Sequence, residues 1–302
     1  ARGCGICRNN RSSNNKYRIK MINGKTILTG VFGWPVKHSL SPIFQNAAFQ
    51  YSHLNWIYVP FEVHPENLQK AIEAIKFFSI KGINITIPHK KNVVKYLDII
   101  DDEVKILGVA NTIINKNGVL KGYITDGIGF LRSLKEDGKF NPKNKKVFLF
   151  GAGGAAFAIS GSLIKAGISM LTICNRTFNN ALMLKSRLKK HFGFNNIVVV
   201  PFQDRNQYAL WKDINLIINA SSVGMKNDHI TLIEEKNLNK NMFIYDIVYN
   251  RKTNLIKSAE KHRIQHLNGL SMLVFQGAVS FNLWTGKTAP IDIMKNSVIL
   301  KQ

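Results

Sequence analysis

Short apolar runs alternate along the chain with longer segments in which apolar residues recur at helical spacing. The run "KTILTGVF" predicts a strand that ends near Gly33, and "WIYVPF" predicts a second strand. Between these two strands, a helix is predicted from about Ser41. Residues 65–77 predict another helix, because three apolar side chains share one face: Leu68, Ile72 and Ile75. Such alternation favours an α/β fold.

The segment "GINITIPHKK", residues 82–91, predicts a third strand and then changes character. Its isoleucines alternate with polar residues, and Pro88 predicts the end of the strand because proline cannot donate to the ladder. His89, Lys90 and Lys91 follow directly. A solvated helix start is one interpretation of this end, since lysine is a surface residue by default. A functional site at the end of the strand is the other.

The remaining pattern divides into two kinds of sheet. "NTIINKNGVLKGY" predicts a hairpin around Asn117-Gly118, so the first half should carry mixed strands. From about Val147, βα units predict a parallel sheet with right-handed crossovers. These units are "VFLF", a helix to Ala166, "MLTIC", a helix over 178–191, "IVVV", "NLIINA" and "MFIYDIV". The last apolar segment, "LSMLVFQGAVSFNLWTG", predicts a long helix that returns to the first domain.

A chain of 302 residues with 45% hydrophobic residues can bury the cores of two domains. We expect an N-terminal α/β domain over 21–126, a Rossmann-type domain over 127–268, and a C-terminal helical segment over 269–302 that packs on the first domain. Residues 1–20 are basic, lack acidic residues and hold little apolar material. We expect them to be a disordered leader before a natural start at Met21, although their composition also fits a transit peptide.

The charge balance is strongly basic, with 42 Lys and Arg against 18 Asp and Glu and a net charge of +24. Nucleic acid, small anionic ligands or a lysine-rich surface would each account for it. Because the basic residues are scattered without interleaved aromatics, we expect no nucleic-acid partner. The uncharged stretch between Lys146 and Lys165 is interrupted by glycines, so it predicts a buried strand and helix and no membrane span.

The cysteine content is low, with Cys4, Cys7 and Cys174. It excludes a disulfide framework and favours a reducing compartment, so we expect a cytoplasmic protein. Cys4 and Cys7 form a C-x-x-C pair, but no second cysteine or histidine pair follows at zinc spacing. We therefore expect no metal site.

The segment "VFLFGAGGAA" places Gly151, Gly153 and Ala156 in a G-x-G-x-x-A array between a predicted strand and a predicted helix. Glycines let the backbone turn tightly and approach a pyrophosphate, whose charge is met by free amides at the helix N-terminus. In this context the array predicts dinucleotide binding.

The end of the following strand predicts which dinucleotide binds. NAD binders usually place an acid there for the ribose hydroxyls, whereas this chain has Asn175, Arg176 and Thr177. Arg176 can stack on adenine and pair with a 2′-phosphate, and Thr177 can donate a hydrogen bond. We therefore expect NADP. The alternative interpretation of Arg176 is an exposed arginine at a helix start.

A second polar cluster follows the first strand. "GWPVKHSLSP" places Ser39 and Ser41 two residues apart, which suits hydrogen bonding to a pair of anionic oxygens. Equally, Ser41 before Pro42 can simply cap a helix.

Several segments together resemble the shikimate dehydrogenase family, in its order and spacing from Gly30 to about Gly286. They are "GVFGWPVKHSLSP", "GINITIPHKK", "GVANT", "GYITDGIG", "FGAGGAA", "NRT", "INASSVGM", "YDIVYN" and "NGLSMLVFQGA". The resemblance implies two α/β domains around a cleft and reversible NADPH-dependent reduction of 3-dehydroshikimate to shikimate, a step toward chorismate and the aromatic amino acids. It is compatible with a monomer or a homodimer.

The matched motifs also imply site residues. Lys90 and Asp126 would be the catalytic pair. Substrate contacts would come from Ser39 and Ser41 for the carboxylate, and from Asn84, Thr86, Asn111, Asp126, Tyr249 and Gln276 for the ring or its hydroxyls. Cofactor contacts would come from Gly151, Ala152, Gly153, Gly154, Ala155, Asn175, Arg176, Thr177, Ser221, Ile247 and Gly269. The chain departs from the usual family pattern outside these positions, at Gln45, Ile124, Arg251, Asn254 and Ser271.

The residue types fit this chemistry independently of the resemblance. When hydride moves to a carbonyl carbon, a nearby group must give the oxygen a proton, and a lysine beside a carboxylate can do so. Either member of the Lys90–Asp126 pair can carry that proton. Two alternatives are a quinate/shikimate dehydrogenase that uses NAD, against which "NRT" argues, and a non-catalytic nucleotide sensor, against which Lys90 and Asp126 argue.

Overall fold

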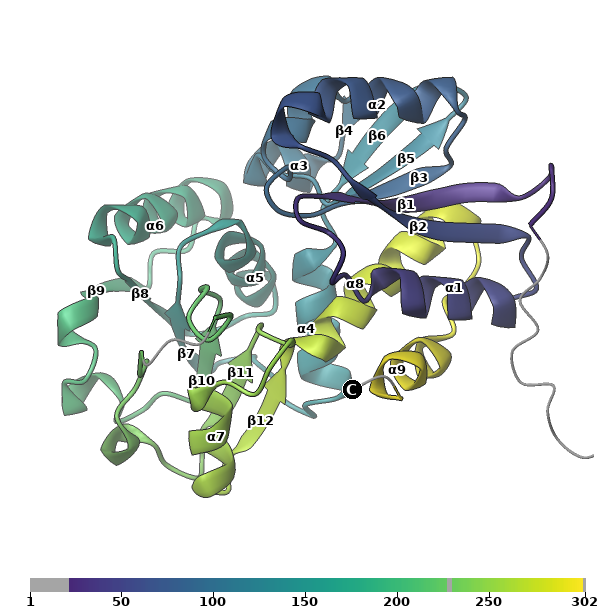
Figure 1. Ribbon diagram of the computed structural model, residues 1–302. Coiled ribbons are helices and arrows are strands. Elements are labelled where there is room, and N and C mark those ends of the chain that lie inside the picture. Colours follow the sequence, from purple (N-terminus) through teal and green to yellow (C-terminus); the bar gives the residue numbers. More distant parts are fainter. Residues whose placement is uncertain (1–21, 227–229, 301–302) are drawn as a thin grey trace, which may run out of the picture.

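The computed structural model describes residues 22–226 and 230–300, which form two six-stranded sheets (Figure 1). The first sheet has the order β2-β1-β3-β5-β6-β4. Its strands are β1 (Ile27–Gly33), β2 (Trp56–Glu62), β3 (Gly82–Ile85), β4 (Ile99–Ile100), β5 (Thr112–Lys116) and β6 (Val119–Tyr123). β1 runs parallel to β2 and β3, whereas β5 is antiparallel to β3 and β6. The predicted mixed sheet is confirmed.

The β5–β6 hairpin forms where the sequence predicted it. Asn117 and Gly118 both have positive φ, 54° and 85°, as a two-residue hairpin turn of this kind requires. The third strand, however, is shorter than predicted. β3 ends at Ile85, a turn begins at Thr86, and Ile87 is 64% exposed. Pro88 therefore lies beyond the strand, although backbone bonds to the β1 segment continue as far as the Ile87 carbonyl, which accepts from the Trp34 amide at 3.1 Å.

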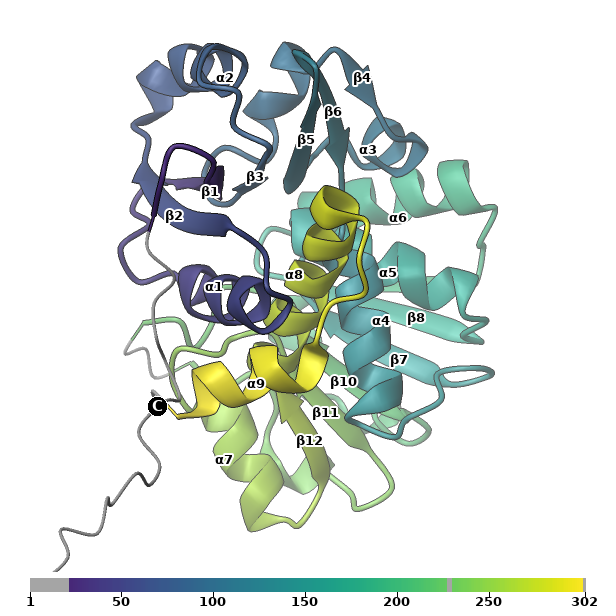
Figure 2. The same cartoon turned by 90° about the vertical axis from the view of Figure 1, so that its right-hand side faces the viewer.

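Helices cover both faces of the first sheet. α2 (Leu68–Phe77), which follows a short 3-10 turn η1 (Pro65–Asn67), buries its predicted apolar face on one side. α1 (Ser41–Tyr51) lies on the other side, together with α8 (Gly269–Thr285) and α9 (Ile291–Ile299) (Figures 1 and 2). The shorter η2 (Asn92–Tyr96) and α3 (Asp102–Leu107) connect β3 to β5 by way of β4.

The second sheet is parallel throughout and has the order β12-β11-β10-β7-β8-β9. Its strands are β7 (Lys146–Phe150), β8 (Met170–Asn175), β9 (Ile197–Pro201), β10 (Leu216–Asn219), β11 (Phe243–Asp246) and β12 (Gln265–Asn268). Its helices are α5 (Gly154–Lys165), α6 (Phe178–Phe192) and α7 (Asn254–Lys261), with 3-10 turns η3 (Phe202–Asp204), η4 (Tyr208–Leu210) and η5 (Glu235–Asn237). Strand order reverses between β7 and β10, and such a reversal is where doubly wound sheets bind ligands.

Two helices lie between the sheets, α4 (Asp126–Glu136) and α8 (Figure 2). They approach closely at Gly129, where an added Cβ would stand 2.7 Å from the backbone nitrogen of Gln276. α8 then continues under the first sheet, where Trp284 Nε1 donates to the Ile113 carbonyl at 3.0 Å. The predicted return of the last long helix to the first domain is confirmed, and α8 is apolar because it is covered on several sides.

The buried apolar residues form three clusters. One joins the α2 face of the first sheet to the α5–α6 face of the second, another fills the opposite face of the second sheet, and the third lies beneath the first sheet against α1, α8 and α9. Within the residues described, no helix is long and apolar enough to cross a membrane. The expected leader, residues 1–20, and its Cys4–Cys7 pair lie outside the described residues.

Candidate active site

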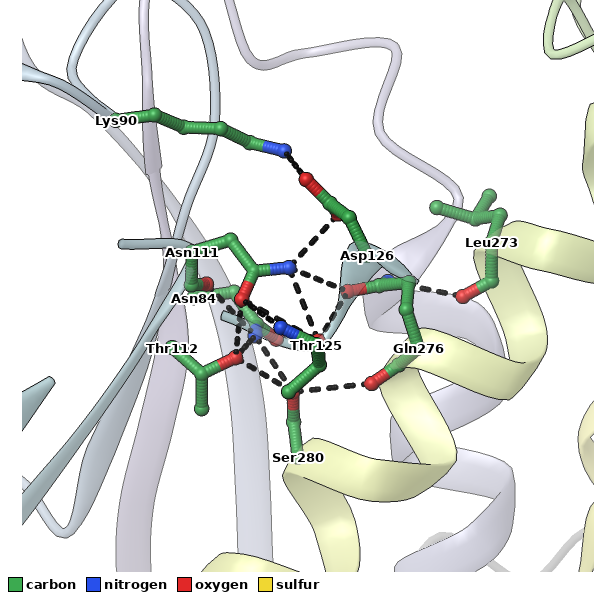
Figure 3. A network of polar contacts seen from close by, with 9 residues as sticks. All are labelled: Asn84, Lys90, Asn111, Thr112, Thr125, Asp126, Leu273, Gln276 and Ser280. Atoms are coloured by element: carbon green, nitrogen blue, oxygen red, sulfur yellow. Dashed lines mark hydrogen bonds and ion pairs between the residues drawn. The ribbon is translucent and has the colours of Figure 1, made fainter. Parts of the chain in front are cut away.

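A network of polar side chains gathers where β3, the start of β5, the start of α4 and the middle of α8 meet (Figure 3). Five of the residues predicted from sequence belong to it: Asn84, Lys90, Asn111, Asp126 and Gln276. In Figure 3, Lys90 reaches Asp126 from one side, whereas Gln276 comes from α8 on the other. Segments more than 180 residues apart in the sequence thus supply one site.

Lys90 and Asp126 are in direct contact. Lys90 Nζ donates to Asp126 Oδ2 at 2.6 Å, and the side chains are 30% and 9% exposed, respectively. The Lys90 carbonyl accepts from the Ala110 amide at 2.9 Å, which fastens the turn after β3 to the segment that carries Asn111. An ion pair at the edge of solvent, with one partner almost buried, can exchange a proton with a bound molecule while staying oriented.

The three polar residues after β3 have separate roles. His89 turns into the core, where Nε2 lies 2.8 Å from the Val63 carbonyl oxygen. Lys91 is exposed, as the solvated interpretation expected. Only Lys90 points into the polar network, because the turn that begins at Thr86 rotates successive side chains to different sides.

Asn111 holds the Asp126 carboxylate in place. Its Nδ2 donates to Asp126 Oδ1 at 2.8 Å and lies 3.3 Å from Gln276 Oε1, while its Oδ1 accepts from the Thr125 amide at 2.9 Å. Thr125 was not among the predicted site residues, although its hydroxyl also contacts Gln276 Oε1 at 3.3 Å. Its position beside Asp126 in "GYITDGIG" was the signal that could have found it.

Asn84 is a buried member of the same network. Its Nδ2 donates to Ser280 Oγ at 2.9 Å and to Thr112 Oγ1 at 3.0 Å, and its Oδ1 accepts from the Tyr58 hydroxyl at 2.8 Å. None of these three partners was predicted from sequence. They lie on α8, β5 and β2, so their contact with Asn84 depends on how those elements pack.

The two predicted serines stand at the start of α1. Ser41 is buried, and its amide donates to Ser39 Oγ at 3.3 Å. The helix begins at Ser41 itself, after Leu40 in the N-cap position, and the Leu40 side chain forms no cap bond there. Capping therefore does not account for the Ser41 hydroxyl.

Two predicted substrate residues form no hydrogen bond with the network through their side chains, within the residues described. Thr86 and Tyr249 are half-buried, and no hydrogen bond joins either side chain to the network within the described part of the chain. Tyr249 lies in the segment after β11, and burial raises the pKa of its phenol. Their predicted contacts stay predictions.

The predicted glycine array forms the turn between β7 and α5. Gly151 has φ +112°, and an added Cβ would stand 2.6 Å from the Ala220 carbonyl oxygen, so only glycine fits there. Gly153 and Gly154 are exposed; nothing lies within 4 Å of an added Cβ at Gly153, and only Val109, at 3.9 Å, lies near one at Gly154. No side chain caps α5, so its first amides face that space, as an anion at a helix N-terminus requires. Ala152 and Ala155 flank these glycines, half-buried.

The other predicted cofactor residues lie along the same edge of the second sheet. Asn175 is the last residue of β8, and Arg176 and Thr177 follow it; Ser221 follows β10; Ile247 follows β11; and Gly269 follows β12. Arg176 and Thr177 are exposed, and the Thr177 hydroxyl makes no cap bond to α6. Gly269 lies against Ile247, since an added Cβ would stand 1.9 Å from its carbonyl oxygen. All of them therefore surround the reversal point between β7 and β10.

Asp246 organises the loops at this edge, although it was not predicted from sequence. Its carboxylate accepts from Asn219 Nδ2 at 2.9 Å, the Val248 amide at 3.0 Å and the Thr253 hydroxyl at 2.7 Å. Burial nevertheless raises the pKa of Asp246 to about 6, because desolvation outweighs these three bonds. Asn219 Oδ1 in turn accepts from Ser221 Oγ at 2.6 Å.

The dinucleotide edge and the polar network adjoin each other. An added Cβ at Gly154 would have Val109 as its nearest neighbour, at 3.9 Å, and Val109 lies two residues before Asn111. Among residues 22–226 and 230–300, no three His, Cys, Asp or Glu side chains gather as a metal site would require. The arrangement suits a dinucleotide on the second sheet that reacts with a small polar molecule held by the first.

Family models match nearly the whole described chain. Residues 31–113 match the shikimate dehydrogenase substrate binding domain, residues 134–271 match shikimate / quinate 5-dehydrogenase, and residues 269–299 match the shikimate 5′-dehydrogenase C-terminal domain.

Individual proteins give the same result. A shikimate dehydrogenase (NADP⁺) from Desulforamulus reducens is 40% identical over 284 residues, covering 93% of this chain and 97% of its own. A crystal structure of a shikimate dehydrogenase in complex with NADP⁺ superposes with a TM-score of 0.87 at 38% identity, covering 93% and 97% of the two chains. The Listeria monocytogenes enzyme in complex with shikimate and NAD gives a TM-score of 0.86 at 34% identity, covering 92% and 98%.

Proposed function

This chain belongs to the shikimate dehydrogenase family, and we propose that its Lys90–Asp126 pair serves the reversible NADPH-dependent reduction of 3-dehydroshikimate to shikimate. The observation that supports the roles of these residues most directly is the 2.6 Å contact between Lys90 and Asp126, next to a glycine loop suited to a dinucleotide. The formation of shikimate is a step in the pathway to chorismate and the aromatic amino acids. The enzyme is therefore an oxidoreductase of the shikimate pathway.

The residues present fit NADP. The open space beside Gly153 and Gly154 and the uncapped start of α5 suit a pyrophosphate. Arg176 and Thr177 are exposed at the end of β8, where a 2′-phosphate would need a cation and a hydroxyl. Ser221, Ile247 and Gly269 would border the nicotinamide end, nearest the polar network.

NADPH, when bound, supplies the hydride that reaches the carbonyl carbon. Lys90 and Asp126 hold the proton that the carbonyl oxygen gains. Asn111 keeps the carboxylate turned toward Lys90 through its 2.8 Å bond to Oδ1, which leaves Oδ2 for the lysine. Because the lysine side chain is only 30% exposed, bulk water competes weakly for that proton.

The other predicted residues bind the substrate in this proposal. Ser39 and Ser41, at the start of α1, receive the carboxylate; this role is supported by the finding that the Ser41 hydroxyl is not used to cap the helix. Asn84, Asn111 and Gln276 contact ring hydroxyls from the floor of the site (Figure 3). Thr86 and Tyr249 are assigned to the same task from the neighbouring turn and loop.

The direct test uses purified protein with shikimate, NADP⁺ and NAD⁺, followed by absorbance of the reduced cofactor. We expect turnover with shikimate and a clear preference for NADP⁺, and slower turnover of quinate. Preference for NAD⁺ or for quinate would instead indicate the quinate/shikimate alternative, and absence of turnover with intact NADP⁺ binding would indicate a nucleotide sensor.

Two expectations about the protein's surroundings are also part of the proposal. We expect a cytoplasmic enzyme that is a monomer or a homodimer, which sedimentation of the purified protein would distinguish. We expect no nucleic-acid partner despite the net charge of +24, because the basic residues are scattered. DNA binding with a steep salt dependence would contradict that expectation.

A further inference from the structure

Arg187, on α6 of the second domain, is bonded to the end of α3 in the first domain, which lies next to α5 and α6 (Figure 2). Its Nη2 donates to the Leu107 carbonyl at 2.8 Å and lies 3.3 Å from the Ile106 carbonyl oxygen. The guanidinium also stands over the ring of Phe157 on α5, 3.9 Å from the ring centroid. One side chain thus links α3 to both α5 and α6.

The end of α3 is a position that favours a cation. The last carbonyls of a helix have no partner within the helix, and they carry its negative partial charge. Arginine suits such a place better than lysine, because its planar fork reaches two acceptors while its face stacks on an aromatic ring. Near the other end of α3, Glu103 accepts from Lys165 on α5. α3 is therefore bonded to the second domain near both of its ends.

The end of α3 leads directly into the active site. Three residues separate Leu107 from Asn111, whose Nδ2 donates to Asp126 Oδ1 at 2.8 Å. Within this segment, the Ala110 amide donates to the Lys90 carbonyl at 2.9 Å. A displacement of Leu107 would therefore reach both members of the Lys90–Asp126 pair through a few residues of chain.

The same segment faces the dinucleotide loop. An added Cβ at Gly154, where α5 begins, would lie 3.9 Å from Val109 Cγ1. The position of this segment relative to Gly154 therefore affects how closely a bound dinucleotide approaches the polar network. Hydride transfer requires reacting atoms about 3 to 3.5 Å apart, so a small displacement lowers its rate strongly.

We propose that Arg187 is a positioning residue for hydride transfer, because its contacts with α3 set the distance between the dinucleotide loop and the Lys90–Asp126 pair. This inference rests on the proposed function, which supplies the hydride and the proton. Arg187 acts through Leu107 and the segment that ends at Asn111, and it touches neither the cofactor nor the substrate. Its loss should therefore slow the chemical step without weakening the binding of either molecule.

The test is Arg187→Ala, with Lys190→Ala as the matched control, because Lys190 is an exposed cation on the same helix. We expect kcat for shikimate oxidation to fall about tenfold in Arg187→Ala, with the KM for shikimate and the Kd for NADP⁺ within about twofold of wild type. Lys190→Ala should match wild type. Arg187→Lys keeps the charge but lacks the planar fork, so its kcat should fall about threefold. If Arg187→Ala does not fold, an unchanged kcat in Arg187→Lys would overturn the proposal.

An isotope effect separates positioning from a merely structural effect. The assay uses shikimate that carries deuterium at the carbon that loses the hydride. Because slower hydride transfer limits turnover more, the isotope effect on kcat in Arg187→Ala should be at least as large as in wild type. A smaller isotope effect would show that another step has slowed, and it would overturn the proposal. An unchanged kcat in Arg187→Ala or an equal fall in Lys190→Ala would do the same.

Hydrogen exchange tests the coupling without turnover. In Arg187→Ala the amides of residues 108–111 should exchange about tenfold faster than in wild type, because α3 has lost its bond to α6, and those of the second sheet should not change. Unchanged exchange over residues 108–111 would overturn the proposal. Failure of the wild-type protein to oxidise shikimate, together with faster exchange in Arg187→Ala, would instead refute the proposed function and support the contact between α6 and α3.

Discussion

Replacing Lys90 by alanine is the most direct perturbation of the proposed chemistry. The change removes the Nζ atom that lies 2.6 Å from Asp126 Oδ2 and leaves that carboxylate with its bond from Asn111. We expect kcat to fall by roughly 10²- to 10⁴-fold, the usual contribution of a general acid or base. That loss corresponds to about 2.7 to 5.5 kcal/mol of transition-state stabilisation. Binding of NADP⁺ should not change, because its predicted contacts lie on the second sheet.

The fold should survive this substitution. Asp126 is nearly buried but keeps one charge-assisted bond, and Lys90 is 30% exposed, so solvent screens part of the lost attraction. We expect a loss of unfolding free energy of about 1 to 3 kcal/mol, which lowers the melting temperature by a few degrees.

Lys91→Ala is the matched control. It removes the same charge one residue later from an exposed side chain, so both variants carry the same net charge. The assay is initial-rate oxidation of shikimate by NADP⁺, with circular dichroism melting and NADP⁺ titration on each variant. Equal and small losses of kcat in the two variants would refute the catalytic role of Lys90. Loss of folding in Lys90→Ala alone would show that the residue is structural.

Three further substitutions test other parts of the structure. Arg176→Asp should raise the Kd for NADP⁺ about tenfold to hundredfold by removing a charge-assisted contact, and an unchanged Kd in a titration would contradict the 2′-phosphate assignment. Gly151→Ala should destabilise the fold and abolish NADP⁺ binding, since φ is +112° and the new Cβ would meet Ala220; wild-type melting and binding would contradict this geometry. Asp246 has a folded pKa of about 6, raised above its unfolded value, so its ionisation costs stability progressively as pH rises from about 4 to 6 and fully above that range. Relative to wild type, Asp246→Asn should therefore gain about 2.5 kcal/mol of unfolding free energy between pH 4 and pH 7.5. A difference that does not vary with pH in denaturant titrations would show that Asp246 is not the titrating group.

Elements with a strong local signal were predictable, and elements with a weak one were not. The hairpin at Asn117-Gly118, the apolar face of α2 and the strand–glycine–helix unit at β7 all follow from short-range sequence preferences. β12 has the polar sequence Gln265–Asn268 at the edge of its sheet, where one strand face is solvated, and its pattern gave no strand signal. α9 lies within the predicted C-terminal helical segment but was not predicted as a separate helix.

The candidate site shows the same division. The sequence predicted the site residues whose chemistry is visible locally, such as Lys90 after a strand and Arg176 where an acid would favour NAD. The sequence did not predict Tyr58, Thr112 or Ser280, because a tyrosine, a threonine and a serine at these positions are ordinary residues of a strand or a helix. They became part of the site only when β2, β5 and α8 packed around Asn84.

The sequence by itself determined the α/β class, the dinucleotide loop, the choice of NADP and the family, because each rests on residue types at fixed local spacing. Only the tertiary structure decided that Lys90 meets Asp126, that His89 turns inward and Lys91 outward, and that Asn84 has partners on three separate elements. The physical reason is that hydrogen bonds and burial act over a few ångströms in space. Which side chains come that close depends on the packing of helices and strands that can be far apart in the chain, as Asn84 and Ser280 are, with a separation of 196 residues.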